Sequence, residues 1–183
     1  MMTYTYSLQE TDFLTHQLFI DSKYKNSRKN RLRTSFIFAI IFLLLALFFY
    51  LQENQNMMIY FLGVGLLSMI VFPLYLKWRY KKHYQKHVRR NFGASFGKKL
   101  FLEFSEEHII GKDEDGSEMK INYSQIDAFH ELPDHYFLKL SNGTAIVVPK
   151  AALSNHEEFQ SEFKKVAKKL GIEIEDNTSW KWK

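Results

Sequence analysis

The chain has 183 residues, a net charge of +5 and no cysteine, which fits one domain of ordinary size without a disulfide framework. Its mean hydropathy of −0.28 is that of a soluble protein, but this average hides two long apolar runs. The positive charge does not indicate nucleic-acid binding, because the bases cluster beside those runs.

The first 33 residues predict a cytoplasmic strand followed by a helix. In the segment MTYTYSL, apolar side chains alternate with polar ones, as in a half-buried strand; they are Tyr4, Tyr6 and Leu8. Ser7 and Glu10 mark the start of the helix. Its apolar side chains are Phe13, Leu14, Ile20 and Tyr24. An isolated strand is unstable, so we predict that this one pairs with the C-terminal sheet.

Two uncharged runs follow, at residues 34–51 and 57–76. As helices they would be roughly 27–30 Å long, close to the hydrocarbon thickness of a bilayer. The core helix of a soluble protein rarely stays uncharged for so long. We therefore predict a transmembrane hairpin over residues 34–78, with spans 34–51 and 57–78 and the polar turn 52–56 outside the cell.

The distribution of charge predicts the orientation of this hairpin. The turn carries Glu53 and no base, whereas residues 77–99 contain nine bases and no acid. Residues 23–33 also lack acids and contain six bases: Lys23, Lys25, Arg28, Lys29, Arg31 and Arg33. Because positively charged loops stay in the cytoplasm, both termini are expected inside. The first apolar run begins after 33 mostly polar residues, so no signal peptide is expected.

Residues 79–98 predict a basic juxtamembrane helix and linker. We define the basic collar as seven residues that should attract anionic lipid at the inner face of the bilayer: Lys77, Arg79, Lys81, Lys82, Lys86, Arg89 and Arg90. From residue 100 onward, 10 lysines stand against 16 acids, a balance of −6. We therefore expect the collar to bind lipid and the acidic C-terminal part not to.

Residues 99–171 predict an antiparallel sheet. Period-2 patterns occur in the segments KLFLEFS, EMKINY, HYFLKL and TAIVV, and they are typical of half-buried strands. The pairs Asp115-Gly116 and Asn142-Gly143 accept the positive φ angles of tight hairpin turns. The strands are therefore expected to be joined by hairpins.

One helix is predicted to close this sheet. Ser154 and Glu157 fit a capping box at its start, and Gly171 is the expected stop. The apolar side chains recur at helical spacing and should cover the open face of the sheet. They are Phe159, Phe163, Val166, Ala167 and Leu170. Residues 172–183 predict a tail whose WKWK ending either frays or touches the membrane interface.

Candidate catalytic and metal-binding groups are few. His83 and His87 are four residues apart on a predicted helix, a spacing that can hold zinc, but the surrounding lysines would repel a cation. His130 and His135 are expected in a hairpin loop with Glu131 and Asp134. The sequence has no serine elbow, glycine-rich phosphate loop or Cys–His pair. We therefore predict no catalytic, cofactor-binding or metal-binding residue.

The segment INYSQIDAFHELPDHYFLKLSNGTAIVVPKAAL resembles the C-terminal domain of YcxB-like bacterial membrane proteins. The resemblance lies in a strand that ends in an aromatic residue, the FHEL and YFLKL strands, and the exit IVVPKAAL. Family members often have Trp where this chain has Tyr123. The resemblance implies an α+β membrane protein of the bacterial plasma (inner) membrane, with a pleckstrin-homology-like half-barrel over residues 99–171. It implies no catalytic residue.

The sequence leaves two classes of function open. The favoured one is a membrane-anchored, non-enzymatic module that binds a protein partner, in regulation or in envelope-stress or immunity-type protection. The alternative is a membrane-associated enzyme or the accessory subunit of a transporter, although spans without ionisable residues argue against an ion pathway. An enzyme should show convergent polar groups with perturbed pKa values, and a binding module an apolar groove or open sheet edge. Gly63, Gly65 and Ser68 permit close helix packing, within one chain or in a homo-oligomer.

Overall fold

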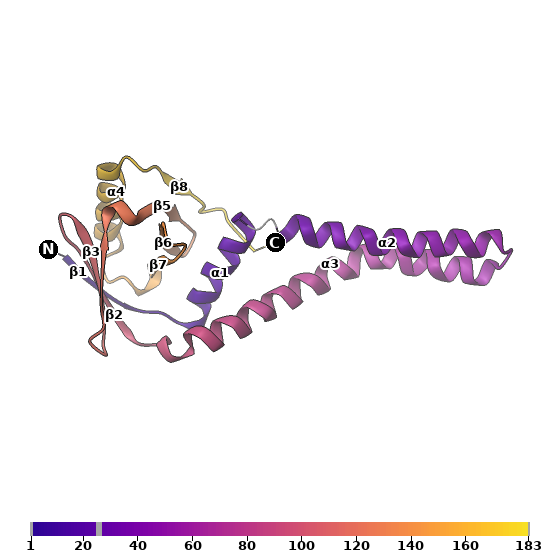
Figure 1. Ribbon diagram of the computed structural model, residues 1–183, viewed down its shortest axis with the longest axis horizontal. Coiled ribbons are helices and arrows are strands. Elements are labelled where there is room, and N and C mark those ends of the chain that lie inside the picture. Colours follow the sequence, from indigo (N-terminus) through magenta and orange to yellow (C-terminus); the bar gives the residue numbers. More distant parts are fainter. Residues whose placement is uncertain (1, 25–26, 183) are drawn as a thin grey trace. The chain divides into compact units, whose positions relative to one another are not determined.

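The computed structural model describes residues 2–24 and 27–182 and has an α+β architecture (Figure 1). The chain divides into two compact units. Unit 1 comprises Met1–Gln17 and His87–Lys181, and unit 2 comprises Leu18–Lys86 and Trp182–Lys183. The helices and strands are, in order, β1 (Met2–Ser7), α1 (Glu10–Tyr24), α2 (Ser27–Leu51), α3 (Gln55–Phe92), η1 (Gly93–Ser95), β2 (Lys99–Phe104), β3 (His108–Asp113), β4 (Glu118–Asn122), η2 (Tyr123–Gln125), β5 (Ile126–Glu131), β6 (His135–Leu140), β7 (Ala145–Pro149), η3 (Lys150–Ala152), α4 (His156–Leu170) and β8 (Ile174–Asp176).

The first sheet of unit 1 has the strand order β1-β2-β3-β4 and is antiparallel throughout. β1 pairs with β2 over all six of its residues, which confirms the predicted pairing of the N-terminal strand. Tyr4 and Tyr6 are buried, whereas Thr3 and Thr5 are exposed. The alternation read from the sequence is thus the alternation between the two faces of this strand.

The second sheet has the strand order β7-β6-β5-β8, and β8 runs parallel to β5. Two expectations are therefore corrected: the strands form two sheets instead of one, and residues 172–183 contain a strand. The ladder extends past β8, because the backbone N–H of Asn177 donates to the carbonyl of Glu131 at 2.8 Å. β8 has only three residues, too few to show a period-2 pattern, so the sequence does not predict it.

Helix α4 packs against both sheets through an aromatic cluster. The Phe159 ring lies 5.0 Å from the Tyr4 ring of the first sheet, measured between centroids. The Phe163 ring lies 4.9 Å from Phe129 and 4.8 Å from Tyr136 in the second sheet. Phe129, Tyr136, Phe159 and Phe163 are all fully buried. The predicted apolar stripe of α4 is therefore the core of unit 1, and it joins the two sheets.

The predicted turn residues take the conformations that their positions require. Gly116 in the β3–β4 hairpin and Gly143 in the β6–β7 hairpin have φ angles of +86° and +84°, and Gly171 ends α4 at +66°, a region that favours glycine. The predicted capping box is wrong by one residue. Asn155, not Ser154, caps α4, and its side-chain oxygen accepts a backbone N–H of the first turn at 3.2 Å.

In unit 2, α2 and α3 pack against each other through small residues. Ala39, Ala46 and Gly65 are buried, and a Cβ atom on Gly65 would lie 3.2 Å from the Cβ of Phe42. The predicted role in close helix packing is therefore right for Gly65. Gly63 makes no such contact within the chain, because a Cβ at that position would meet nothing within 4 Å, so its role in a homo-oligomer stays a prediction.

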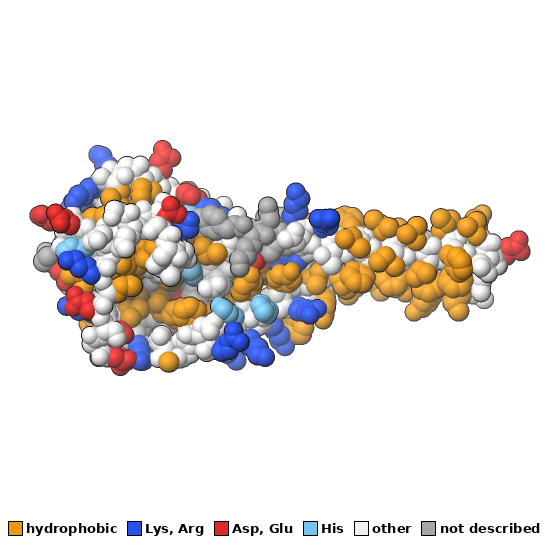
Figure 2. Space-filling view, in the orientation of Figure 1, with side chains coloured by type: hydrophobic (Ala, Val, Ile, Leu, Met, Phe, Trp, Pro, Cys, Tyr) orange, Lys and Arg blue, Asp and Glu red, His pale blue; other side chains and the backbone are white. Residues whose placement is uncertain are grey.

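The outer surface of α2 and α3 is apolar (Figure 2). All but one of the exposed large apolar side chains in the described chain lie between Leu32 and Trp78. Both helices are long and apolar enough to span a membrane, and only 17% and 6% of their most apolar stretches are buried. The core helix of a soluble protein would be mostly buried.

The turn between these helices is shorter than residues 52–56. α2 ends at Leu51 and α3 begins at Gln55, because a polar residue caps the second helix: the Asn54 side chain accepts the N–H of Met57 at 3.2 Å. Glu53 has a φ of +59° and makes the reversal. At its other end α3 runs without a break into the basic segment and ends at Phe92.

Candidate functional site

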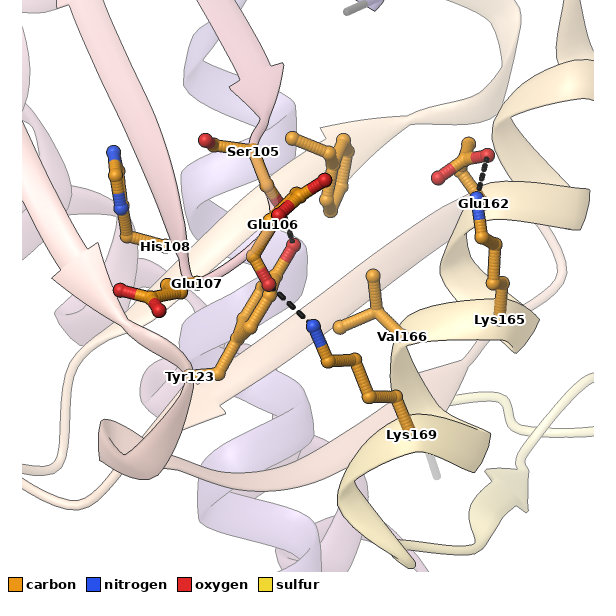
Figure 3. A pocket seen from close by; sticks show the side chains of 10 residues that line it. Ser105, Glu106, Glu107, His108, Tyr123, Glu162, Lys165, Val166 and Lys169 are labelled. Atoms are coloured by element: carbon orange, nitrogen blue, oxygen red, sulfur yellow. Dashed lines mark hydrogen bonds and ion pairs between the residues drawn. The ribbon is translucent and has the colours of Figure 1, made fainter.

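A polar groove of about 950 Å³ lies beside the β2–β3 turn in unit 1 (Figure 3). One wall is the turn itself, and the opposite wall is the outer side of α4. Its lining residues are Phe104, Ser105, Glu106, Glu107, His108, Tyr123, Glu162, Lys165, Val166 and Lys169. The groove contains three glutamates, two lysines and a histidine. This cluster of titratable side chains makes it the candidate site for acid–base chemistry in unit 1.

Four polar side chains of this groove are bonded within it: Tyr123, Glu162, Lys165 and Lys169. The Tyr123 hydroxyl donates to the carbonyl of Ser105 at 2.6 Å, and its pKa is raised by burial and by the nearby charge of Glu162. The Lys169 ammonium donates to the carbonyl of Glu106, and Lys165 pairs with Glu162 at 3.3 Å. These bonds fix the turn and stabilise α4. Among the residues of the groove that the structure describes, no nucleophile is hydrogen-bonded to a base.

The four histidines singled out in the sequence are dispersed. His130 and His135 are buried on β5 and β6, not in the connecting loop as predicted. His130 Nδ1 lies 3.5 Å from the carboxylate of Glu175 on β8, and His135 Nε2 lies 3.0 Å from the carboxylate of Asp12 on α1. The loop prediction was wrong because these strands extend to either side of a turn of only three residues.

His83 and His87 lie on α3. His83 is exposed, and His87 is half-buried and hydrogen-bonded to Asn91 at 3.0 Å. Within residues 2–24 and 27–182, no three His, Cys, Asp or Glu side chains are grouped so that they could hold a metal ion. The described polar contacts of His87, His130 and His135 are thus with other side chains of the protein.

An apolar groove of about 310 Å³ opens between the two sheets of unit 1. Its walls come from β1 to β4 on one side and from β7 on the other, and its apolar lining residues include Tyr6, Leu8, Phe13, Leu100, Leu102, Met119, Ile121, Ile146 and Val147. Gly111 on β3 lies between Leu102 on β2 and Met119 on β4 in the ladder. Because Gly111 has no side chain, the Met119 side chain can lie beside it, and a Cβ on Gly111 would be 3.8 Å from the Met119 Cε.

The strands that border this groove have open edges. In the described part of the chain β4 pairs only with β3, and β7 pairs only with β6. Met119 is 53% exposed, and it is the single large apolar side chain exposed in the described part of unit 1. An open strand edge beside an apolar groove is the arrangement that binds extended peptide segments in strand-addition complexes. From the sequence, an apolar groove or an open sheet edge was expected of a binding module, but the residues that form it were not predicted.

The basic collar is mostly exposed. Arg79, Lys81, Lys82, Lys86, Arg89 and Arg90 are exposed on α3, and Lys77 is half-buried. The Lys82 ammonium lies 4.2 Å from the centroid of the Trp78 ring, and Arg89 donates to the carboxylate of Glu10 at 2.8 Å. On the α2 side, Lys25 and the side chain of Arg28 lie outside the described residues, and Arg31 is buried. The collar is therefore accessible, but its members differ in their contacts.

The model of the YcxB-like protein family matches residues 104–164. This segment is YcxB-like. The match confirms the resemblance read from the sequence, and it covers β3 to β7 and the first part of α4. The YcxB-like segment contains Gly111, Met119 and Val147 of the apolar groove, whereas Tyr6 and Leu102 lie outside it. No curated protein and no solved structure matches the chain significantly.

Proposed function

We propose that this protein is a membrane-anchored, non-enzymatic binding module whose YcxB-like segment takes up an extended segment of a protein partner. The apolar groove between β4 and β7 carries this proposal. An extended segment could pair with the open edge of β4 and place an apolar side chain beside Met119, in the space above Gly111. The polar groove carries the proposal less well, because its Tyr123, Lys165 and Lys169 side chains are bonded to the β2–β3 turn or to a neighbouring residue of α4.

The fold of unit 1 supports a pleckstrin-homology-like assignment. Its strands form two sheets, and the C-terminal helix α4 packs against both of them. Versions of this fold that bind lipid headgroups present a basic face, whereas the chain from residue 100 onward has a balance of −6. The acidic balance favours a protein partner that has basic residues near the apolar side chain it places in the groove.

The anchor in this proposal is the α2–α3 pair. Its exposed apolar surface is stable only if lipid or protein covers it. Bases flank the α2–α3 pair at its open end and Glu53 lies in its turn, which favours insertion with both termini in the cytoplasm.

A reporter enzyme that is active only after export tests this orientation. Fused after Lys183, it is expected to be inactive, whereas fused within the turn at Asn54 it is expected to be active. A reporter active at Lys183 and inactive at Asn54 would refute the proposed orientation. Protein recovered in the soluble fraction would refute the membrane anchor.

Site-specific photo-crosslinking tests the apolar groove. A photoreactive amino acid replaces Met119, whose side chain lines the groove, in the full-length protein in native membranes. The matched control replaces Lys120, the next residue on β4, whose side chain points to the opposite face. We expect a discrete crosslinked product from position 119 and at most about a tenth of its yield from position 120.

A groove-filling variant sharpens this test. Gly111→Val adds methyl groups beside Met119, where the partner side chain would lie. The added Cβ itself is tolerated, because its nearest neighbours, the Cε and the carbonyl oxygen of Met119, are 3.8 Å and 3.9 Å away. The crosslink from position 119 is expected to fall about tenfold in this variant, since a blocked pocket costs on the order of 1–2 kcal/mol. Equal yields from positions 119 and 120, or a yield unaffected by Gly111→Val, would refute binding in the groove.

A further inference from the structure

A second cavity, of about 420 Å³, lies in unit 2 between α2 and α3. Its lining residues are Arg31, Thr34, Leu76, Arg79, Tyr80 and His83. The cavity is basic, because two guanidinium groups and an imidazole line it and, among the described residues, no acidic side chain does. The basic collar as read from the sequence contains Arg79 but neither Arg31 nor His83.

Helical spacing brings these side chains together. Leu76, Arg79, Tyr80 and His83 occur at positions i, i+3, i+4 and i+7 of α3, which is one face of a helix. Arg31 and Thr34 occur at i and i+3 of α2 and form the facing wall. The two walls meet where the two apolar runs end, since Thr34 is the first residue of one uncharged run and Leu76 is the last residue of the other.

Aromatic rings hold Arg31 in this wall. The Arg31 side chain is almost fully buried, at 4% exposure. Its guanidinium carbon lies 4.5 Å from the ring centroid of Trp182 and 5.5 Å from that of Tyr80. Trp182, in the tail predicted to fray or to touch the membrane interface, packs on this cation; contact with the interface stays a prediction. A stacked guanidinium keeps its planar set of donors in a fixed orientation.

Asp21 is a buried acid of unit 2 that does not line the cavity. It accepts a hydrogen bond from the Tyr84 hydroxyl at 2.6 Å. Burial and Asp21 raise the pKa of Tyr84, and the charge of Arg31 opposes them. Asp21 is thus bonded to Tyr84, whereas Arg79 and His83 are exposed at the cavity and available to a ligand.

We propose that this cavity binds the phosphate group of an anionic lipid. Arginine donors match the oxygens of a phosphate, and a basic pocket at the cytoplasmic end of two spanning helices is suited to a lipid headgroup. The apolar outer surface of α2 and α3 then accommodates the acyl chains. A soluble phosphate shares the headgroup chemistry but gains nothing from that surface. The inference rests on the membrane anchor proposed above.

Lipid retention by the purified full-length protein tests this site. The protein is extracted in mild detergent with equal amounts of phosphatidylglycerol and phosphatidylcholine, and bound lipid is counted by native mass spectrometry. We expect one phosphatidylglycerol per chain in preference to phosphatidylcholine. Arg79→Gln should lower this occupancy about fivefold to tenfold, since one well-placed base contributes on the order of 1 kcal/mol or more.

Arg33→Gln is the matched control. It makes the same substitution at an exposed position of unit 2 that belongs neither to the cavity nor to the basic collar, so occupancy should stay within about twofold of the unmodified protein. Equal losses in both variants would show a diffuse attraction and refute the site. Displacement of the lipid by an equal concentration of glycerol phosphate would assign the cavity to a soluble phosphate and refute the lipid assignment.

An alkaline wash of the membranes before extraction keeps two possible failures apart. If the wash releases the protein from the membranes, the proposed anchor is wrong. If the protein resists the wash but the two variants retain equal amounts of phosphatidylglycerol, the anchor stands and the lipid site is wrong. Arg31→Gln is not used as the principal variant, because a change at this buried position could destabilise unit 2.

Discussion

Deletion of residues 1–7 is expected to unfold unit 1. The deletion removes β1, exposes the edge of β2 and takes two buried tyrosines, Tyr4 and Tyr6, out of the core. Loss of one large buried aromatic side chain costs about 3–5 kcal/mol. Two such losses are comparable with the whole stability of a domain, about 5–15 kcal/mol.

Limited proteolysis of the full-length protein in membranes measures this effect. Residues 99–171 should resist the protease in the unmodified protein and be cleaved rapidly after the deletion. The double variant Thr3→Ala/Thr5→Ala is the control, because it alters only the exposed face of β1 and should cost about 1 kcal/mol or less. Unchanged protease resistance after the deletion would show that β1 is not required for the fold.

Acidification is expected to destabilise unit 1 through His16 on α1. The Nε2 atom of His16 is buried, and it has no hydrogen-bond partner among the described residues. Its ring packs edge-on against Phe137 at 5.1 Å. Burial, with a smaller effect from nearby His135, lowers the pKa of His16 from 6.5 to about 4. The groups facing this site are thus apolar or, in the case of the His135–Asp12 pair, bonded to each other at 3.0 Å.

The direction of the effect depends on whether the folded or the unfolded chain binds the proton more tightly. Between pH 6.5 and 4 the imidazole is protonated in the unfolded chain and neutral in the folded one, so falling pH favours the unfolded chain. The stabilising effect of the neutral imidazole is complete above pH 6.5 and is lost as the pH falls to about 4. A pKa difference of this size corresponds to about 3 kcal/mol.

Chemical unfolding curves of the full-length protein at several pH values test this. We expect His16→Leu to lose about 3 kcal/mol less than the unmodified protein between pH 7 and 4. The difference between the two profiles isolates His16 from the other groups that titrate over this range. Profiles that fall in parallel would refute the assignment of a depressed pKa to His16.

Local sequence patterns were sufficient to predict several elements of the fold. The alternation around Tyr4 and Tyr6, the hairpin pairs at Gly116 and Gly143, and the helix stop at Gly171 all express preferences that operate within a few residues. β3 and β8 were not predicted. Gly111 interrupts the apolar pattern of β3, and β8 is held by pairing with a strand more than 40 residues earlier in the chain.

The candidate sites were less predictable, because each depends on long-range register. The exposed bases of the collar follow directly from the sequence. The apolar groove exists because Gly111 faces Met119 across one ladder and Leu102 across another, and no local pattern encodes that coincidence. The basic cavity of unit 2 likewise depends on Arg31, whose environment includes a tryptophan from the other end of the chain.

The position of β1 has a consequence for biosynthesis. The ribosome completes β1 at Ser7, but the strand that pairs with it begins at Lys99. At typical elongation rates of about 5–20 residues per second, β1 waits on the order of 5–20 s for its partner. The last strand and α4, which complete the core, are synthesised later still. Unit 1 therefore cannot complete its core before both apolar helices have been synthesised, and during that interval Tyr4 and Tyr6 lack the strand with which they pair in the folded protein.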